Sequence, residues 1–181
     1  MARKARGRVH AGVYHVWRRT AGPILMFRDD NDRTDFCNRL ARAITRFEWQ
    51  CMSFVLMPTH FHFLLWVDDD VLSPGMSLLF GGYAQQFNRR WSRKGHLKAE
   101  PFKLRRINDD ADLQGVVRYI ARNPVRDRLC ELPQDWAWSS YRGSAEYATS
   151  FPFVNDRDAL ACFHETRARA IRQLRVFVEI D

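Results

Sequence analysis

The sequence predicts an α+β fold in which an antiparallel sheet carries two helices on one face. Short segments rich in apolar, β-branched and aromatic residues are typical of strands, and segments with apolar residues three and four positions apart are typical of helices. Along the chain they follow the order strand, helix, strand, strand, helix, strand. At 181 residues the chain is long enough for one domain of ordinary size, or for one domain with an extension.

The first strand and the first helix lie near the N-terminus. Residues 12–19, GVYHVWRR, are rich in β-branched and aromatic side chains and predict a strand. From Asp32 to Phe47 apolar residues recur at helical spacing, which predicts a helix with Asp32 as its N-cap.

Two apolar runs then follow with a turn between them. These runs are Trp49 to Met57 and Phe61 to Val67, and the turn is Pro58-Thr59. We expect the two runs to pair as a hairpin.

The remaining elements complete the pattern. Ser73-Pro74 opens a second helix that extends toward Trp91, although Gly81-Gly82 in its middle weakens the prediction. A basic loop follows, and residues 102–107, FKLRRI, predict a fourth strand. The β-α-β-β-α-β order is that of the ferredoxin-like split motif.

A further helix is added to this core. It is predicted from Asp109 to Asn123, with an apolar face of Leu113, Val116, Val117 and Ile120, and Pro124 is expected to end or kink it. Beyond Cys130 the sequence predicts an irregular, aromatic-rich segment, and then a final helix or two between Asp156 and Val178.

Basic residues are in excess and are unevenly distributed. The formal net charge is +8, which makes nucleic acid the expected partner. Three basic runs stand at residues 3–8, 85–107 and 167–175. The middle run contains Arg89, Arg90, Arg93, Lys94, Lys98, Lys103, Arg105 and Arg106 against only Glu100. Each run taken singly is also typical of a solvated helix face.

Cysteine usage and hydropathy narrow the class of protein. Cys37, Cys51, Cys130 and Cys162 form no CxxC pair, so we expect reduced, mostly buried thiols rather than a zinc ribbon or a disulfide framework. No stretch of about twenty apolar residues predicts a membrane span, and no apolar signal core follows the basic N-terminus. A cytosolic protein is expected.

Two histidines in one strand raise a chemical question. His60 and His62 stand two residues apart, so their imidazoles point to the same side of the sheet while Phe61 points into the core. This spacing predicts a bidentate metal clamp, and the alternative is one surface histidine beside one that serves as aromatic filler. Tyr119 and Asn123, one turn apart on the added helix, offer a phenol and an amide oxygen, although packing is the commoner role of a helical tyrosine.

Several spaced motifs carry a family resemblance. They are MPTHFHFLL, GHL at 95–97, YIARNPVR and AWSSYRG at 137–143. Together they resemble the IS200-like single-tyrosine HUH transposases, and more closely their REP-associated branch. The resemblance runs from about Tyr14 to Gly143, so residues 1–143 are expected to form the transposase domain and residues 144–181 a C-terminal helical extension.

The resemblance implies a metal-dependent DNA strand transferase. His60 and His62 would bind a divalent metal ion, Mg²⁺ or Mn²⁺, and Asn123 would complete the site. Tyr119 would attack the DNA to give a 5′-phosphotyrosyl intermediate. The substrate would be single-stranded or hairpin DNA, contacted by the middle basic run and by His96, and the protein would act as a monomer or a homodimer.

Some points stay open from the sequence. The general base for Tyr119 could be His15, His96, Lys103 or a metal-bound water, and bases could stack on Trp91, Phe102, Trp136 or Trp138. The segments 18–22 and 98–101 depart from the family pattern, which leaves DNA specificity undetermined. Two other classes of function are a non-catalytic nucleic-acid-binding protein of the same fold and a hydrolase in which water attacks.

Overall fold

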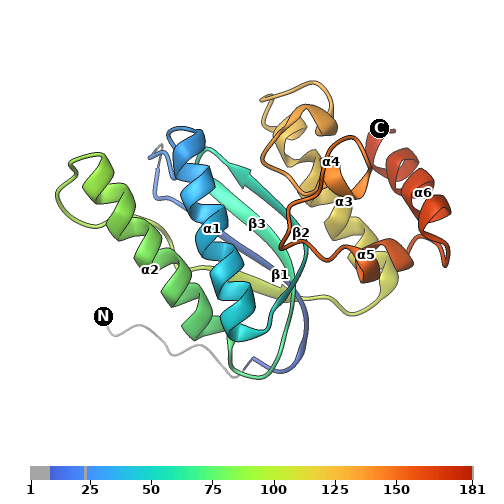
Figure 1. The fold of residues 1–181 in the computed structure, drawn as a ribbon, viewed down its shortest axis with the longest axis horizontal. Coiled ribbons are helices and arrows are strands. Elements are labelled where there is room, and N and C mark those ends of the chain that lie inside the picture. The colour runs from blue at the N-terminus through green and yellow to red at the C-terminus, as the bar shows by residue number, and fades with distance from the viewer. Residues whose placement is uncertain (1–8, 23, 181) are drawn as a thin grey trace.

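The computed structural model describes residues 9–22 and 24–180, and it has three layers (Figure 1). Helices α1 (Asp30–Phe47) and α2 (Leu72–Arg90) cover one face of a four-stranded sheet. Helix α3 (Asp110–Arg126) and the short and C-terminal helices lie on the other face. These last are η1 (Pro133–Asp135), α4 (Tyr141–Ser144), α5 (Arg157–Ala161) and α6 (Arg167–Glu179).

The sheet has the ferredoxin-like order. Its strands are β1 (Gly12–Arg19), β2 (Gln50–Met57), β3 (His60–Val67) and β4 (Lys103–Arg106). They lie in the order β2-β3-β1-β4, and every neighbouring pair is antiparallel. Met57 pairs with His60, so Pro58-Thr59 forms a two-residue turn. The fold class predicted from the sequence and the expected hairpin are therefore confirmed.

The first helix begins earlier than predicted. Its N-cap is Asp29, whose carboxylate accepts a hydrogen bond from the backbone N–H of Asp32 at 3.0 Å. The prediction of Asp32 as the N-cap was wrong, because two acidic residues three positions apart give the same local pattern. Asp32 is instead buried and accepts hydrogen bonds from the backbone N–H of Arg28 and from Nε1 of Trp91.

The added helix continues through its proline. Asp109 caps α3, and its carboxylate accepts from the backbone N–H of Asp112 at 2.8 Å. Pro124 was predicted to end or kink the helix, but α3 runs on to Arg126. A proline removes only one backbone hydrogen bond when it stands in the last turn, and here its ring is buried.

Two irregular segments cover the outer edge of β2. The backbone N–H of Leu56 donates to the Trp138 carbonyl at 2.9 Å, and the backbone N–H of Asn155 donates to the Cys51 carbonyl at 2.8 Å. Nε1 of Trp136 also donates to the Leu56 carbonyl. The aromatic-rich segment after Cys130 thus satisfies backbone groups that an edge strand would leave unpaired.

The sheet divides the interior into two cores. Strand alternation sends Phe54, Phe61 and Phe63 toward α1 and α2, and sends Val55, Met57 and Leu64 toward α3 and the C-terminal helices. All four cysteines are free thiols; Cys37 and Cys51 are buried, and Cys130 and Cys162 are partly buried. Among the described residues no helix is long and apolar enough to cross a membrane.

Candidate active site

Strand β3 presents the two predicted imidazoles on the face of the sheet that α3 covers. His60 pairs across the sheet with Arg19 of β1, and His62 pairs with Trp17. The two imidazole ring centroids are 5.1 Å apart, and each histidine is only 4% exposed. Phe61, between them, is buried in the opposite core, as the spacing predicted.

Helix α3 brings Asn123 to this pair. Oδ1 of the Asn123 amide lies 3.1 Å from Nε2 of His60, and Asn123 is 4% exposed. The other ring nitrogen of His60, Nδ1, lies 3.1 Å from the Thr59 hydroxyl. Both nitrogens of His60 therefore have a polar partner, which fixes the plane of its ring.

Tyr119 stands one turn before Asn123 and faces the same histidines. Its ring centroid is 5.2 Å from that of His62, in an edge-to-face arrangement. The Arg126 guanidinium lies 5.1 Å from the centroid of the tyrosine ring. Tyr119 is 36% exposed, so a phenol beside buried imidazoles remains open to solvent. The structure thus brings together all four residues that the resemblance singled out.

His15 of β1 joins the site. Its Nε2 lies 2.9 Å from Nδ1 of His62, and its ring centroid is 5.7 Å from that of Tyr119. The sequence suggested His15 only as one of several general bases. The predicted ferredoxin-like order already places β1 beside β3, but the register that puts His15 diagonal to His62 is not visible in the sequence alone.

Burial keeps these imidazoles neutral. It lowers the pKa of His62 to about 2, helped by the neighbouring His15 and His60. Burial, with the charge of Arg105, lowers the pKa of His15 to about 4. The pKa of His60 is also lowered by burial, against a smaller raising effect of the hydrogen bond to Asn123. Neutral imidazole is the form that coordinates metal ions.

The donor atoms suit a divalent cation. The side chains that converge here offer two imidazoles, those of His60 and His62, and the amide oxygen of Asn123. Within the described part of the chain no group of three or more His, Cys, Asp or Glu side chains is placed to hold a metal ion. Nε2 of His60 and Oδ1 of Asn123 are 3.1 Å apart. Two adjacent ligands of one octahedral ion, each about 2.1 Å from it, stand about 3 Å apart, which this spacing matches. The residues therefore fit a metal ion.

A pocket of about 240 Å³ opens beside Tyr119. Besides Tyr119 and the two histidines of β3, it is lined by Trp17, Arg18, Arg19, Glu100, Pro101 and Lys103. Segments 18–22 and 98–101, which depart from the family pattern, meet here. The Glu100 N–H donates to the Arg19 backbone carbonyl at 2.9 Å, and the Ala21 N–H donates to the Lys98 backbone carbonyl at 3.0 Å. The pocket therefore combines two cations that could hold phosphate, Arg19 and Lys103, with the aromatic side chain of Trp17.

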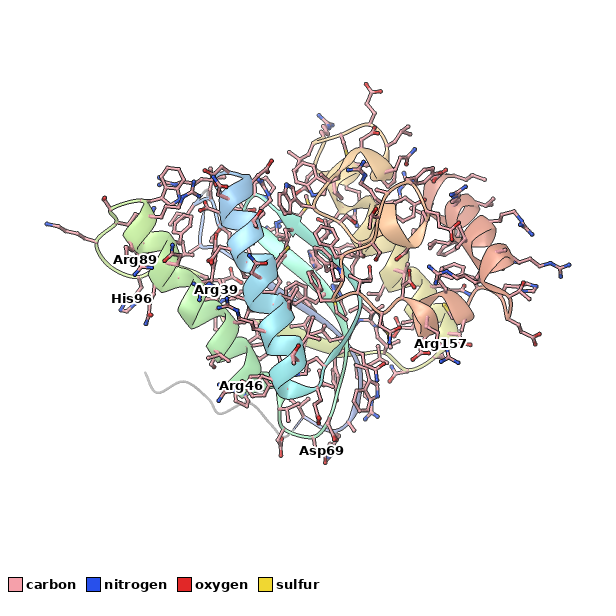
Figure 2. The ribbon with its side chains drawn as sticks, in the orientation of Figure 1. Arg39, Arg46, Asp69, Arg89, His96 and Arg157 are labelled. Atoms are coloured by element: carbon pink, nitrogen blue, oxygen red, sulfur yellow. The ribbon has the colours of Figure 1, made fainter. Side chains whose placement is uncertain are left out.

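The predicted DNA contacts do not form one cluster. Arg89 and His96 lie at the end of α2 and in the loop after it, in the layer on the other side of the sheet from Tyr119 (Figure 2). Lys94 and Lys98 are exposed in the same loop, and Arg93 lies 5.8 Å from the ring centroid of Phe87. Only Lys103 of this group lines the pocket.

Four of these arginines already bind groups of the protein, and one of them, Arg89, donates to Oε1 of Gln86. Arg90 pairs with Asp29 at 2.6 Å and with Asp32 at 2.5 Å, which joins the end of α2 to the start of α1. Arg105 makes two hydrogen bonds of 2.8 Å to Asp112. Arg106 donates to the Ala11 carbonyl at 3.1 Å. A DNA phosphate would have to share these guanidinium groups with their present partners.

The positions of the side chains reduce the number of candidates for the general base and for base stacking. Nε2 of His15 is engaged by His62, and His96 is not among the pocket residues, whereas Lys103 is. Phe102 is 5% exposed within the core, so it presents no face on which a base could stack. Nε1 of each tryptophan considered for stacking is bonded: Trp91 to Asp32, Trp136 to the Leu56 carbonyl and Trp138 to Asp30.

Comparisons with known proteins agree with the resemblance. No family model matches the chain. A Haemophilus influenzae protein with the provisional name REP-associated tyrosine transposase is 25% identical over an alignment of 133 residues, and the match covers 65% of this chain and 76% of that protein. The solved structure of a REP-associated tyrosine transposase bound to a REP hairpin has a TM-score of 0.66 at 18% identity, over 84% of this chain and 90% of that chain. A provisionally named transposase from Deinococcus radiodurans gives a TM-score of 0.44 at 16% identity, over 71% of this chain and 95% of its own. The resemblance to REP-associated tyrosine transposases is confirmed, and the fold is shared with the solved hairpin complex.

Proposed function

We propose that this chain is a divalent-metal-dependent enzyme that cuts and rejoins single-stranded or hairpin DNA, with Tyr119 as the nucleophile. The observation that carries the proposal is the convergence of Tyr119 and Asn123 of α3 on His60 and His62 of β3. The names of the relatives support a DNA-processing role, and one of the solved neighbours was bound to a REP hairpin.

His60, His62 and Asn123 would hold the metal ion, Mg²⁺ or Mn²⁺. When bound, such an ion withdraws charge from the scissile phosphate. Magnesium prefers oxygen ligands, so a set with two imidazole nitrogens favours Mn²⁺ in vitro. The three side chains are each only 4% exposed, and both histidines line the pocket beside Tyr119 through which DNA would reach them.

Tyr119 would carry out the covalent step. Its phenolic oxygen forms a bond to phosphorus while the bond from phosphorus to the 3′ oxygen breaks, so the DNA is left with a 5′-phosphotyrosyl link and a free 3′ hydroxyl. The phenolic proton lost by Tyr119 is matched by the proton that the departing 3′ oxygen takes up. Because a phenolate leaves more readily than a sugar alkoxide, a DNA 3′ hydroxyl can reverse the step and rejoin the strand without ATP.

The pocket cations would bind the DNA on either side of that phosphate. Arg19 and Lys103 line the pocket beside Tyr119, and Trp17 offers an aromatic face there. The guanidinium of Arg18 instead lies 3.6 Å from the ring centroid of Phe80, in the core on the other face of the sheet. The exposed basic residues of the loop after α2, among them Lys94, His96 and Lys98, would extend the phosphate contacts.

The test is a search for the covalent intermediate. A labelled DNA hairpin is incubated with the protein and Mn²⁺, and the products are separated under denaturing conditions. We expect a protein–DNA adduct with the wild type and none with Tyr119→Phe, which keeps the ring but lacks the attacking oxygen. Cleavage without any adduct would identify a hydrolase, and binding without cleavage a non-catalytic DNA-binding protein.

The variant His60→Ala distinguishes the cleavage of DNA from the binding of DNA. We expect this variant to lose cleavage but to bind the hairpin within a few-fold of the wild type, because phosphate contacts rather than the metal supply most of the affinity. Hairpin binding is measured by fluorescence anisotropy at fixed salt, and cleavage by gel. An affinity that falls as far as the cleavage rate would contradict the assignment of His60 to the metal.

A further inference from the structure

His15 lies where it can control one of the two metal-binding imidazoles. In the register of β1 and β3, His15 pairs with Leu64 and stands diagonal to His62, which pairs with Trp17. Nε2 of His15 lies 2.9 Å from Nδ1 of His62, in a site where His15 is 8% exposed and His62 is 4% exposed. This hydrogen bond is therefore buried, and water does not compete for it.

The ring of His15 is itself held in place. Its centroid is 4.8 Å from that of Trp17 and 5.7 Å from that of Tyr119, which meets it edge to face. A ring packed on two sides has little freedom to rotate, so the direction of its hydrogen bond to His62 is set before any ligand arrives.

The hydrogen bond decides which nitrogen of His62 is available. Since Nδ1 faces His15, only Nε2 is left for coordination. A histidine that coordinates through Nε2 carries its proton on Nδ1 and donates it to a neighbour, which here must be an unprotonated Nε2 of His15. The Thr59 hydroxyl, which can donate or accept, lies 3.1 Å from Nδ1 of His60. Both imidazoles of β3 are thus held by a polar partner on Nδ1.

We propose that His15 is a positioning residue that fixes the ring orientation and the tautomer of His62 and so offers its Nε2 to the metal ion. This inference rests on the proposed function. His15 then acts through His62 and not on the DNA. It is not the base that deprotonates Tyr119 either, because a neutral ring whose bare Nε2 accepts from His62 carries its own proton on Nδ1.

The first test measures Mn²⁺ binding to the full chain without DNA, by calorimetry. His15→Phe keeps an aromatic ring against Trp17 and Tyr119 but removes the hydrogen bond, and we expect it to weaken Mn²⁺ binding about 10- to 100-fold, the usual cost of losing such a partner. His15→Gln places an amide near the position of Nε2, and we expect it to recover binding to within a few-fold of the wild type. A purely structural role predicts no such rescue.

His60→Ala separates failure of this inference from failure of the proposed function. If His60→Ala and the wild type bind Mn²⁺ equally, the ion is not held at the histidine pair, and both proposals are overturned. If His60→Ala loses binding but His15→Phe keeps the wild-type affinity, the metal site stands and the role of His15 is overturned.

A second measurement uses the unaltered protein and does not depend on how a variant folds. Nitrogen-15 NMR of the imidazoles, with Mg²⁺ as a diamagnetic ion, reports which ring nitrogen carries the proton. We expect His62 to carry it on Nδ1 and His15 to have a bare Nε2. A proton on Nε2 of His15, donated to His62, would overturn the proposal.

Discussion

At the scale of single residues, burial controls the chemistry of the site more than charge does. His60, His62 and His15 lie within one buried cluster, and desolvation is the first cause of the lowered pKa of each. The same burial that keeps them neutral, and so able to coordinate a metal ion, also prevents them from accepting protons when the protein is acidified.

This burial predicts a pH dependence of stability. The pKa of His62 falls from an ordinary 6.5 to about 2, and that of His15 from 6.5 to about 4. Between pH 6.5 and about pH 4 the unfolded chain therefore binds protons that the folded chain does not. The free energy of unfolding should fall as the pH falls through this window, by up to about 1.4 kcal/mol per pH unit for each such proton.

Urea denaturation at pH 7.5, 6 and 5 measures this slope. His15→Phe removes one of the buried imidazoles, so its free energy of unfolding should depend less steeply on pH than that of the wild type. Equal slopes for the two proteins, with equal urea m-values, would contradict the assignment of the pH dependence to this cluster.

At the scale of elements, local sequence patterns predicted those strands and turns whose structure is determined by residues close in sequence. Strand alternation and the Pro58-Thr59 turn gave the hairpin of β2 and β3, since register there is set by the turn itself. The start of α1 was missed because Asp29 and Asp32 both resemble caps, and only the fold reveals that Asp32 is bound by Arg90 and Trp91. The passage of α3 through Pro124 likewise depends on packing against the rest of the chain.

The candidate site was also predictable only in part: the residues on each element could be predicted, but not all of the contacts between elements. The spacing of His60 and His62 and of Tyr119 and Asn123 placed each pair on one face of its own element, and the family motifs joined the two pairs. The role of His15 depends on the pairing of β1 with β3, which are far apart in sequence. The partners of Arg90 and Arg105 are also set by the fold, and sequence counts both arginines simply as positive charge.

Two glycines of α2 give opposite predictions. A Cβ on Gly75 would lie 2.7 Å from Cη2 of the buried Trp49, and closer still to Cζ2, whereas a Cβ on Gly81 would meet nothing within 4 Å. Gly75→Ala should therefore destabilise the protein by about 1–3 kcal/mol through overpacking. Gly81→Ala should stabilise it by about 0.5–1 kcal/mol, because alanine loses less backbone entropy in a helix.

Thermal or urea unfolding of the two variants checks this pair, and each serves as the control for the other. A loss of stability in Gly81→Ala as large as in Gly75→Ala would mean that the helix backbone, rather than the contact with Trp49, requires glycine.

At the scale of the whole molecule, the helix that carries Tyr119 and Asn123 lies between the sheet and the C-terminal segment. Val116, Val117 and Ile120 of α3 share one apolar core with α5 and α6. Polar contacts add to it: Arg118 donates to the Ile180 carbonyl at 2.6 Å, and the Tyr141 hydroxyl donates to Glu179 at 2.5 Å. Residues 144–181 therefore pack against α3, the helix that carries Tyr119 and Asn123, and hold it in place.

A single buried side chain of α6 tests this support. Leu174 is 2% exposed within the shared core, so Leu174→Ala should cost about 2–5 kcal/mol of unfolding free energy. Arg169→Ala, at an exposed position of the same helix, should change it by no more than about 0.5 kcal/mol. A variant of Leu174 as stable as the wild type would mean that α6 packs only loosely on α3.

The division at Gly143, which the family resemblance suggested, makes the sharpest prediction at this scale. A chain that ends at Gly143 would expose the apolar side of α3 to water, and α3 supplies both Tyr119 and Asn123. We expect this shortened chain to lose cooperative unfolding in urea and to form no covalent adduct with a hairpin and Mn²⁺, while Arg169→Ala in the full chain keeps both. If the shortened chain unfolds cooperatively and forms adduct at the wild-type rate, residues 1–143 are a self-sufficient domain, and α5 and α6 serve another purpose.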